Sequence, residues 1–109
     1  MFERDFLLRE VQKLSELIAK IARLRTERKL DPALDEIASG YERFGMKKSM
    51  LEYLDPSSLV RMVGSPEVVA AVGRLMEEEA AILEERGDPN ADAKRARAQL
   101  LIEAGGGGE

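Results

Sequence analysis

Four prolines divide this sequence, and each of them directly follows a residue that commonly caps a helix. The four pairs are Asp31-Pro32, Asp55-Pro56, Ser65-Pro66 and Asp88-Pro89. An aspartate or serine side chain accepts a hydrogen bond from an unpaired amide of the first helical turn. Proline at the first helical position lacks only an amide that has no partner there. The pairs therefore predict four helix starts. Gly64 and Gly87, placed just before two of them, predict left-handed helix ends.

Apolar residues recur with the period of an α-helix along the chain, so we expect an all-α fold of four to six helices. The first and longest should run from about Arg4 to Lys29, with an apolar stripe formed by Leu7, Val11, Leu14, Ile18 and Ile21. The others are expected at about residues 32–44, 46–54, 56–63, 66–86 and 89–104, with a break at Gly45. The last of them is the weakest, because its apolar residues are largely alanines. We expect a single domain over residues 1–104 and a flexible glycine-rich tail over 105–109.

The composition excludes most catalytic chemistry. The 109 residues include no cysteine and no histidine. Thiolate nucleophiles, Ser–His–Asp and Cys–His arrangements, and the commonest metal ligands are therefore missing. We expect a protein that is not an enzyme and that holds no metal or cofactor.

No segment of the sequence resembles a membrane span. The longest apolar run, Val68 to Val72, is far shorter than the roughly 20 residues that a spanning helix needs. The first ten residues carry five charges and do not resemble a secretory signal. We therefore expect a cytoplasmic protein with no membrane contact.

Charge is distributed unevenly along the chain, whose net charge is −4. Residues 1–30 carry eight Lys/Arg and five Asp/Glu, whereas residues 31–90 carry six and thirteen. A basic first helix and an acidic middle favour attraction to a charged protein or to a second copy. The basic stretch from Lys20 to Lys29 contains no aromatic residue on which a base could stack. We therefore expect no nucleic-acid binding. A solvated face, or an intramolecular match to Glu84 and Glu85, is the interpretation we favour for this stretch.

Large and small residues follow a rhythm that resembles a tetratricopeptide repeat. Its members on two successive helices are Leu17, Ile21, Leu24, Ala33, Ile37 and Gly40. In such a repeat the small residues let two antiparallel helices approach closely. A looser second unit runs from Met76 through the Gly87-Asp88 turn to Leu100, with Arg97 where a bulky apolar residue is usual.

The whole chain also resembles an uncharacterised bacterial family of short tetratricopeptide-like proteins. Its members open as this chain does, with Asp5-Phe6-Leu7 leading into a long first helix. The resemblance implies tetratricopeptide-like antiparallel hairpins. It implies no activity.

In a tetratricopeptide-like array, the first helices of each pair line a groove that holds a partner segment. Aligning the two units places Arg25, Arg74, Glu77, Glu84 and Glu85 on that face. Its mixed but largely acidic character suits a basic or mixed-charge peptide. The leading hypothesis is therefore a non-catalytic module that binds a protein or peptide partner.

Two other hypotheses remain open. The apolar arc of the first helix, which includes Phe2 and Phe6, is wide enough to pack against a second copy, as in a structural homodimer. The other hypothesis is a small-ligand pocket formed by Tyr41, Phe44, Met46, Met50 and Tyr53. Aromatic and methionine side chains at helical spacing are, however, more typical of a core.

Glu79 lies beside the apolar arc of its helix, as Lys20 does on the first helix. An ion pair with Lys20, Arg23 or Arg28 is one interpretation. We favour the other, in which Glu79 extends to solvent from the rim of the core.

Overall fold

A computed structural model of the chain is all-α and describes residues 4–43 and 47–106. The described part contains six helices and no strand. In chain order they are α1 (Arg4–Thr26), α2 (Leu30–Glu42), α3 (Lys48–Tyr53), α4 (Pro56–Val63), α5 (Pro66–Glu85) and α6 (Ala91–Ala104). The predicted fold class and the long first helix are confirmed. The predicted break at Gly45, together with Phe2, Phe44 and Met46, lies outside the described residues.

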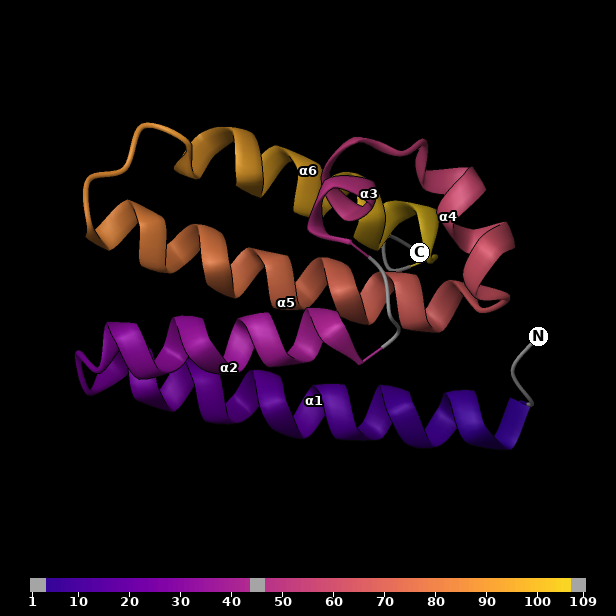
Figure 1. Cartoon of the computed structure of the whole chain (residues 1–109), viewed down its shortest axis with the longest axis horizontal. Coiled ribbons are helices and arrows are strands. Elements are labelled where there is room, and N and C mark those ends of the chain that lie inside the picture. Colours follow the sequence, from indigo (N-terminus) through magenta and orange to yellow (C-terminus); the bar gives the residue numbers. More distant parts are fainter. Residues whose placement is uncertain (1–3, 44–46, 107–109) are drawn as a thin grey trace.

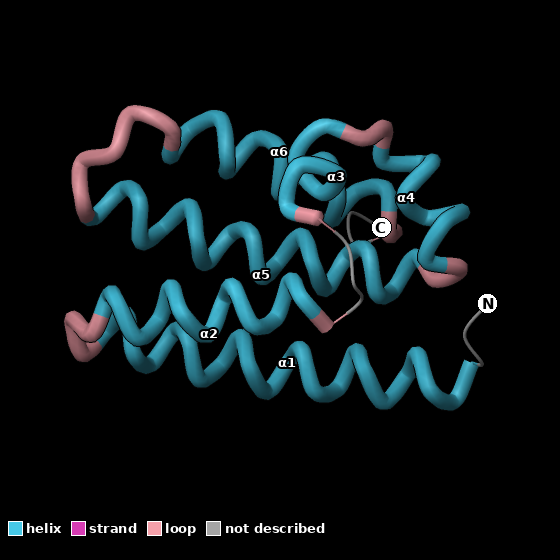
Figure 2. Tube along the Cα trace, viewed as in Figure 1, coloured by secondary structure: helices cyan, strands magenta, loops and turns pink. Residues whose placement is uncertain are grey.

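The helices form two antiparallel hairpins with α5 in the middle of the molecule (Figure 1). α1 and α2 pack against one side of α5, and α6 packs against the other. α1 and α5 run in the same direction, and the turns that close the two hairpins lie at the same end of the molecule (Figure 2). The short helices α3 and α4 connect the hairpins, and α4 contacts both α5 and α6. None of the described helices combines the length and the hydropathy that crossing a membrane requires.

The core is centred on α5, where side chains from both hairpins meet. Its largest fully buried members are Leu14, Ile21, Ile37, Leu59, Val68, Leu75, Met76, Ile82 and Leu101. Within the predicted stripe of α1, Leu7 is also buried, whereas Val11 and Ile18 are partly buried. The apolar period therefore placed the inward face of α1 correctly.

Small residues bring α6 very close to α5. A Cβ atom added at Gly73 would lie 2.9 Å from the carbonyl oxygen of Ala98 and 2.8 Å from Cγ1 of Ile102. Ala91 and Ala98 of α6 are buried in the same interface. Close backbone packing therefore stabilises a helix whose sequence contains few large apolar residues.

Two of the four predicted capping pairs are confirmed. The Asp55 carboxylate accepts a hydrogen bond from the Ser58 amide at 3.2 Å, and the Ser65 hydroxyl accepts one from the Val68 amide at 3.3 Å. The proline that follows each cap lies in the first turn of its helix. Gly64 and Gly87 have φ angles of 82° and 71°, the left-handed conformation predicted for them.

The other two capping predictions are wrong. At both turns the helix begins at a different residue from the proline that was expected to open it. Arg28 adopts a φ of 65°, and the amide of Lys29 bonds back to the Leu24 carbonyl at 2.8 Å. This reversal ends α1 at Thr26 and starts α2 at Leu30, so Asp31 lies inside the first turn and pairs with Arg86. In the second turn Asp88 accepts the Asn90 amide at 2.8 Å, and α6 begins only at Ala91.

Because Asp55 and Ser65 cap a helix and Asp31 does not, replacing either of the first two should destabilise the protein more than replacing Asp31. We expect Asp55→Ala and Ser65→Ala each to lower the free energy of unfolding by about 1 kcal/mol, because each leaves a first-turn amide without its acceptor. Asp31→Ala should cost less than about 0.5 kcal/mol, since it removes only an exposed ion pair. Urea denaturation of the three variants measures this, and equal losses at all three positions would contradict the assignment.

Candidate functional site

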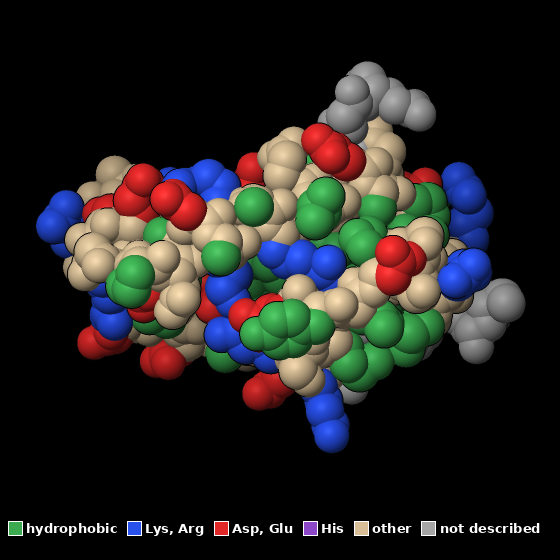
Figure 3. Space-filling model, turned by 90° about the horizontal axis from the view of Figure 1, so that it is seen from above, with side chains coloured by type: hydrophobic (Ala, Val, Ile, Leu, Met, Phe, Trp, Pro, Cys, Tyr) green, Lys and Arg blue, Asp and Glu red, His purple; other side chains and the backbone are tan. Residues whose placement is uncertain are grey.

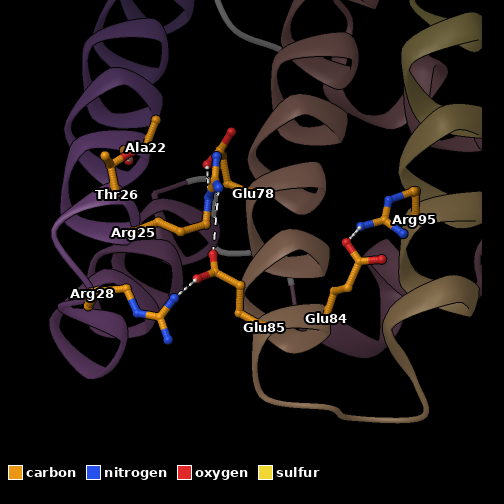
Figure 4. Close-up of polar contacts among 8 residues, drawn as sticks. All are labelled: Ala22, Arg25, Thr26, Arg28, Glu78, Glu84, Glu85 and Arg95. Carbon is orange, nitrogen blue, oxygen red and sulfur yellow. Dashed lines mark hydrogen bonds and ion pairs between the residues drawn. The ribbon is translucent and has the colours of Figure 1, made fainter.

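The residues predicted to bind a partner lie on α1 and α5, and two of them contact each other. Nε of Arg25 lies 3.2 Å from Oε1 of Glu78, and its Nη1 lies 3.6 Å from Oε2 of Glu85 (Figure 4). Glu85 also accepts a hydrogen bond from Arg28 at 3.3 Å. These ion pairs cross from α1 to α5 and hold the two helices together near the turn end of the molecule.

The remaining predicted residues do not join that group. Glu84 points to the opposite side of α5 and pairs with Arg95 of α6 at 3.0 Å (Figure 4). Arg74 is exposed and Glu77 is half-buried, and neither forms an ion pair within the described part of the chain. The carboxylates of Glu84 and Glu85 are thus largely neutralised within the molecule. The face is less acidic than the sequence alone indicates.

Beside α5, α1 presents a continuous uncharged surface, which we call the α1 strip. It consists of residues spaced three or four apart, which share one side of a helix. They are Leu8, Val11, Ser15, Ala19, Ala22 and Thr26. All six are exposed or half-buried. The hydroxyl of Thr26 donates to the Ala22 carbonyl at 2.9 Å, so it is already bonded to its own helix.

A second group of polar residues, which the sequence did not reveal, surrounds Glu79. Only 5% of Glu79 is exposed, and its carboxylate accepts a hydrogen bond from the Tyr41 hydroxyl at 2.6 Å. Lys48 donates to its other oxygen at 3.0 Å, and Lys94 lies 3.7 Å away. Lys94 also pairs with Glu52. We call these five residues, from four different helices, the polar cluster.

The interpretation that Glu79 extends to solvent is therefore wrong. Its partners come from α2, α3 and α6, whereas the sequence analysis considered only bases of the first helix. One feature of the sequence agrees with the burial of Glu79, namely its position directly before the buried Ala80 at the edge of the apolar arc. Within the described residues, no buried side-chain nitrogen or oxygen lacks a hydrogen-bond partner. The buried polar atoms of these residues are thus all hydrogen-bonded.

The polar cluster stabilises two of its groups, Tyr41 and Lys48, in their ordinary protonation states. Burial, followed by the charge and hydrogen bond of Glu79, raises the pKa of Tyr41, so its hydroxyl stays a neutral donor. Burial lowers the pKa of Lys48, but the hydrogen bond and charge of Glu79 outweigh it, and the net shift is upward. An activated nucleophile needs the opposite shift. The cluster therefore has a structural role in the first instance.

Arg97 anchors α3 from the side of α6. Its Nε donates to the Leu51 carbonyl at 2.8 Å, and its Nη2 donates to the Leu54 carbonyl. These are carbonyls at the C-terminal end of α3, which have no partner within that helix. The contacts explain why a charged residue occupies this half-buried position of α6. Burial lowers the pKa of Arg97.

A cleft of about 410 Å³ lies beside the polar cluster. It is bounded by α3, by the turn that joins α5 to α6, and by the first half of α6. Lys and Arg side chains lie near the middle of the face that carries α3, α4 and α6 (Figure 3). Tyr53, which is 83% exposed, lines this cleft, whereas Tyr41 lies in the core. The two tyrosines of the predicted ligand pocket therefore do not share one cavity.

Glu10 forms a smaller polar site between α1 and the end of α2. Its buried carboxylate accepts two hydrogen bonds from Arg43, at 3.0 and 2.8 Å, and lies 3.3 Å from Lys13. Burial raises the pKa of Glu10, but the hydrogen bonds and charges of Arg43 and Lys13 lower it more. Glu10 thus remains ionised and ties the two helices together.

Comparison with models of protein families, with curated proteins and with solved structures finds no similar protein. Among the described residues, no group of three or more carboxylates is arranged to hold a metal ion. Two surfaces are candidate sites in the described part of the chain, the face formed by the α1 strip with α5 and the cleft beside the polar cluster.

Proposed function

We propose that the chain is a non-catalytic protein-interaction module that holds a peptide segment on the shared face of α1 and α5. The observation that carries this proposal is the parallel, side-by-side packing of these two helices, each the first helix of its hairpin (Figure 1). The uncharged α1 strip lies along one side of this seam. On α5, Arg74 and Glu77 carry charges that no other described side chain neutralises.

A tetratricopeptide-like arrangement of the two hairpins belongs to this proposal. It is supported by the contacts of α5 with both helices of the first hairpin. A Cβ atom at Gly40 would lie 2.7 Å from Cδ2 of Leu75, so a small residue is required where α2 approaches α5. The insertion of α3 and α4 between the hairpins is the main departure from a regular array. A cytoplasmic location is also part of the proposal and is supported by the absence of cysteine.

The partner that fits this face best is a peptide of mixed charge. A strongly basic peptide would require free carboxylates, but Glu84 and Glu85 are engaged with Arg95, Arg25 and Arg28. Two charges of α5 on this face, the base Arg74 and the acid Glu77, form no ion pair with any described residue and lie about one helical turn apart. A segment with an acidic and a basic side chain at similar separation complements them. Its uncharged residues would cover the α1 strip.

Fluorescence anisotropy with labelled acidic, basic and mixed-charge peptides tests the proposal. We expect the mixed-charge peptides to bind best. The double variant Arg74→Glu/Glu77→Lys should weaken this binding by about tenfold, because it reverses the local charges and leaves the net charge unchanged. Glu103→Lys, on an exposed position of α6, is the control and should have little effect. Binding that is the same in the double variant and the wild type would remove this face from consideration.

Self-association through the first helix is the competing proposal. It is favoured by the exposure of large apolar side chains on α1, namely Phe6 at 41% and Leu8 at 46%. A second copy could cover the α1 strip, with its small residues at the centre of the contact. Sedimentation equilibrium decides the matter. A dimer that Ala19→Glu dissociates would support the proposal, and a monomer at tens of micromolar would exclude it.

A further inference from the structure

We infer that the cleft between α3 and α6 binds a small monocarboxylic acid with an apolar or aromatic body. The cleft is separate from the α1–α5 face and holds about 410 Å³, within the size range of small-molecule sites. Its lining combines two kinds of side chain. Arg97 and four members of the polar cluster are charged, whereas Tyr53, Leu83 and Ala93 offer apolar surface.

Arg97 is the one cation of the cleft lining that forms no ion pair in the described part of the chain, and the charges of Asp55 and Glu52 act on it only from beyond ion-pair distance. Glu79 is compensated by Lys48 and Lys94, and Glu52 by Lys94. None of the ion pairs found across residues 4–43 and 47–106 includes Arg97, which bonds only to two backbone carbonyls. A guanidinium has five N–H donors, so several remain available after those two bonds.

The third carboxylate of the cleft does not neutralise Arg97. Asp88 lies in the turn before α6, where it accepts the amide of Asn90 at 2.8 Å. Asn90 and Arg97 are about two helical turns apart along the chain, which corresponds to roughly 10 Å. Partial burial of Arg97 disfavours its charged form, as the lowered pKa indicates. A bound carboxylate would compensate for this by charge and by two parallel hydrogen bonds.

The uncharged side chains of the lining supply apolar contact for the rest of the ligand. Tyr53 is the most exposed of the large hydrophobic side chains in the described part of the chain, at 83%. Its ring therefore contributes little to the core and is free to pack against a ligand. Leu83 is half-buried and Ala93 is exposed on the same cleft. An acid with a short aromatic or branched chain can contact Arg97 and these apolar side chains at once, whereas a dianion such as a phosphate monoester would be repelled more strongly by the carboxylates of Glu52 and Glu79.

A titration followed by amide chemical shifts tests this inference with 3-phenylpropionate and its neutral amide as probes. We expect the acid to bind the wild-type chain at least about tenfold more tightly than the amide, because only the acid gains a charge-assisted bond. The shifts should be centred on the amides of Ala93 and Arg97. Arg97→Gln should reduce the affinity for the acid to that for the amide. Tyr53→Ala should weaken both probes by a similar factor.

Two further variants separate binding from folding. Arg97→Lys keeps the positive charge and should retain a preference for the acid, even though it weakens the attachment of α3. Arg95→Gln removes a neighbouring guanidinium that pairs with Glu84 and does not line the cleft, so it should leave the affinity unchanged. Equal affinities of the wild type for acid and amide would overturn the inference. So would absent binding of the acid at millimolar concentration, or equal losses in Arg95→Gln and Arg97→Gln.

Discussion

Replacement of Glu79 by leucine should lower the free energy of unfolding by about 3 kcal/mol. The substitution leaves the Tyr41 hydroxyl without its acceptor inside the core, and it removes one of the two carboxylates that compensate the buried Lys94. Lys94 keeps Glu52, and the half-exposed Lys48 can extend into water. The expected loss is therefore near the lower end of the range for breaking a buried ion pair.

Urea denaturation measures this loss, and Glu77→Leu is the matched control. Glu77 lies on the same helix, is only half-buried, and forms no ion pair among the described residues. Its replacement should change the free energy of unfolding by less than about 0.5 kcal/mol. A double-mutant cycle with Tyr41→Phe adds a second measurement. Tyr41→Phe should cost about 1 kcal/mol in the wild type and almost nothing in the Glu79→Leu background. Independent, additive losses would contradict the described bond.

Gly73→Ala is expected to lower the free energy of unfolding by about 2 kcal/mol. The added methyl group would lie 2.9 Å from a backbone oxygen of α6 and 3.0 Å from the Ile102 amide nitrogen, so the two helices must move apart. Overpacking of this kind typically costs 1–3 kcal/mol or more. The higher helix propensity of alanine returns about 1 kcal/mol, which reduces the loss without reversing it.

Gly40→Ala is the control for Gly73→Ala, because both glycines lie within helices and both substitutions gain the same propensity. Around Gly40 the nearest atoms are methyl groups of Leu75 and Leu17, at 2.7 and 3.0 Å. These groups lie at the ends of side chains and can shift, whereas the backbone of α6 cannot without disturbing its hydrogen bonds. The change at Gly40 should stay within about 1 kcal/mol. Thermal unfolding compares the two variants, and a larger loss at Gly40 would contradict the described α5–α6 interface.

The helices could be predicted from the sequence because their signals are local. The apolar stripe of α1 and the Asp55-Pro56 and Ser65-Pro66 pairs depend only on residues within a few positions of each other. The same signals failed at Asp31, where the left-handed Arg28 shifts the turn. No pattern of residue types distinguishes the two situations, since Asp-Pro is compatible with both.

The candidate sites could be predicted only in part, because they depend on distant partners. Helical spacing places Arg25 and Glu85 on one face and allows an ion pair between them, but it does not distinguish that pair from a solvated basic stretch. The structure shows the pair. Glu79 and Lys94 are charged residues of the kind normally found at the surface, and their burial follows from contacts with α2 and α3. Arg97 likewise acquires its role only when α3 lies beside α6.

Because α5 lies in the middle of the molecule, a cut in the chain between the two hairpins would expose core residues. The first hairpin and α6 rest on opposite sides of this one helix. If the chain were severed between Glu42 and Lys48, the leading fragment would lose the surface that shelters Leu14 and Ile21, and the trailing fragment would expose one flank of α5. The trailing fragment keeps apolar contacts among α4, α5 and α6, whereas the leading fragment keeps no part of α5. We therefore expect the first hairpin to unfold when it is separated from α5, and the two hairpins of the intact chain to unfold together.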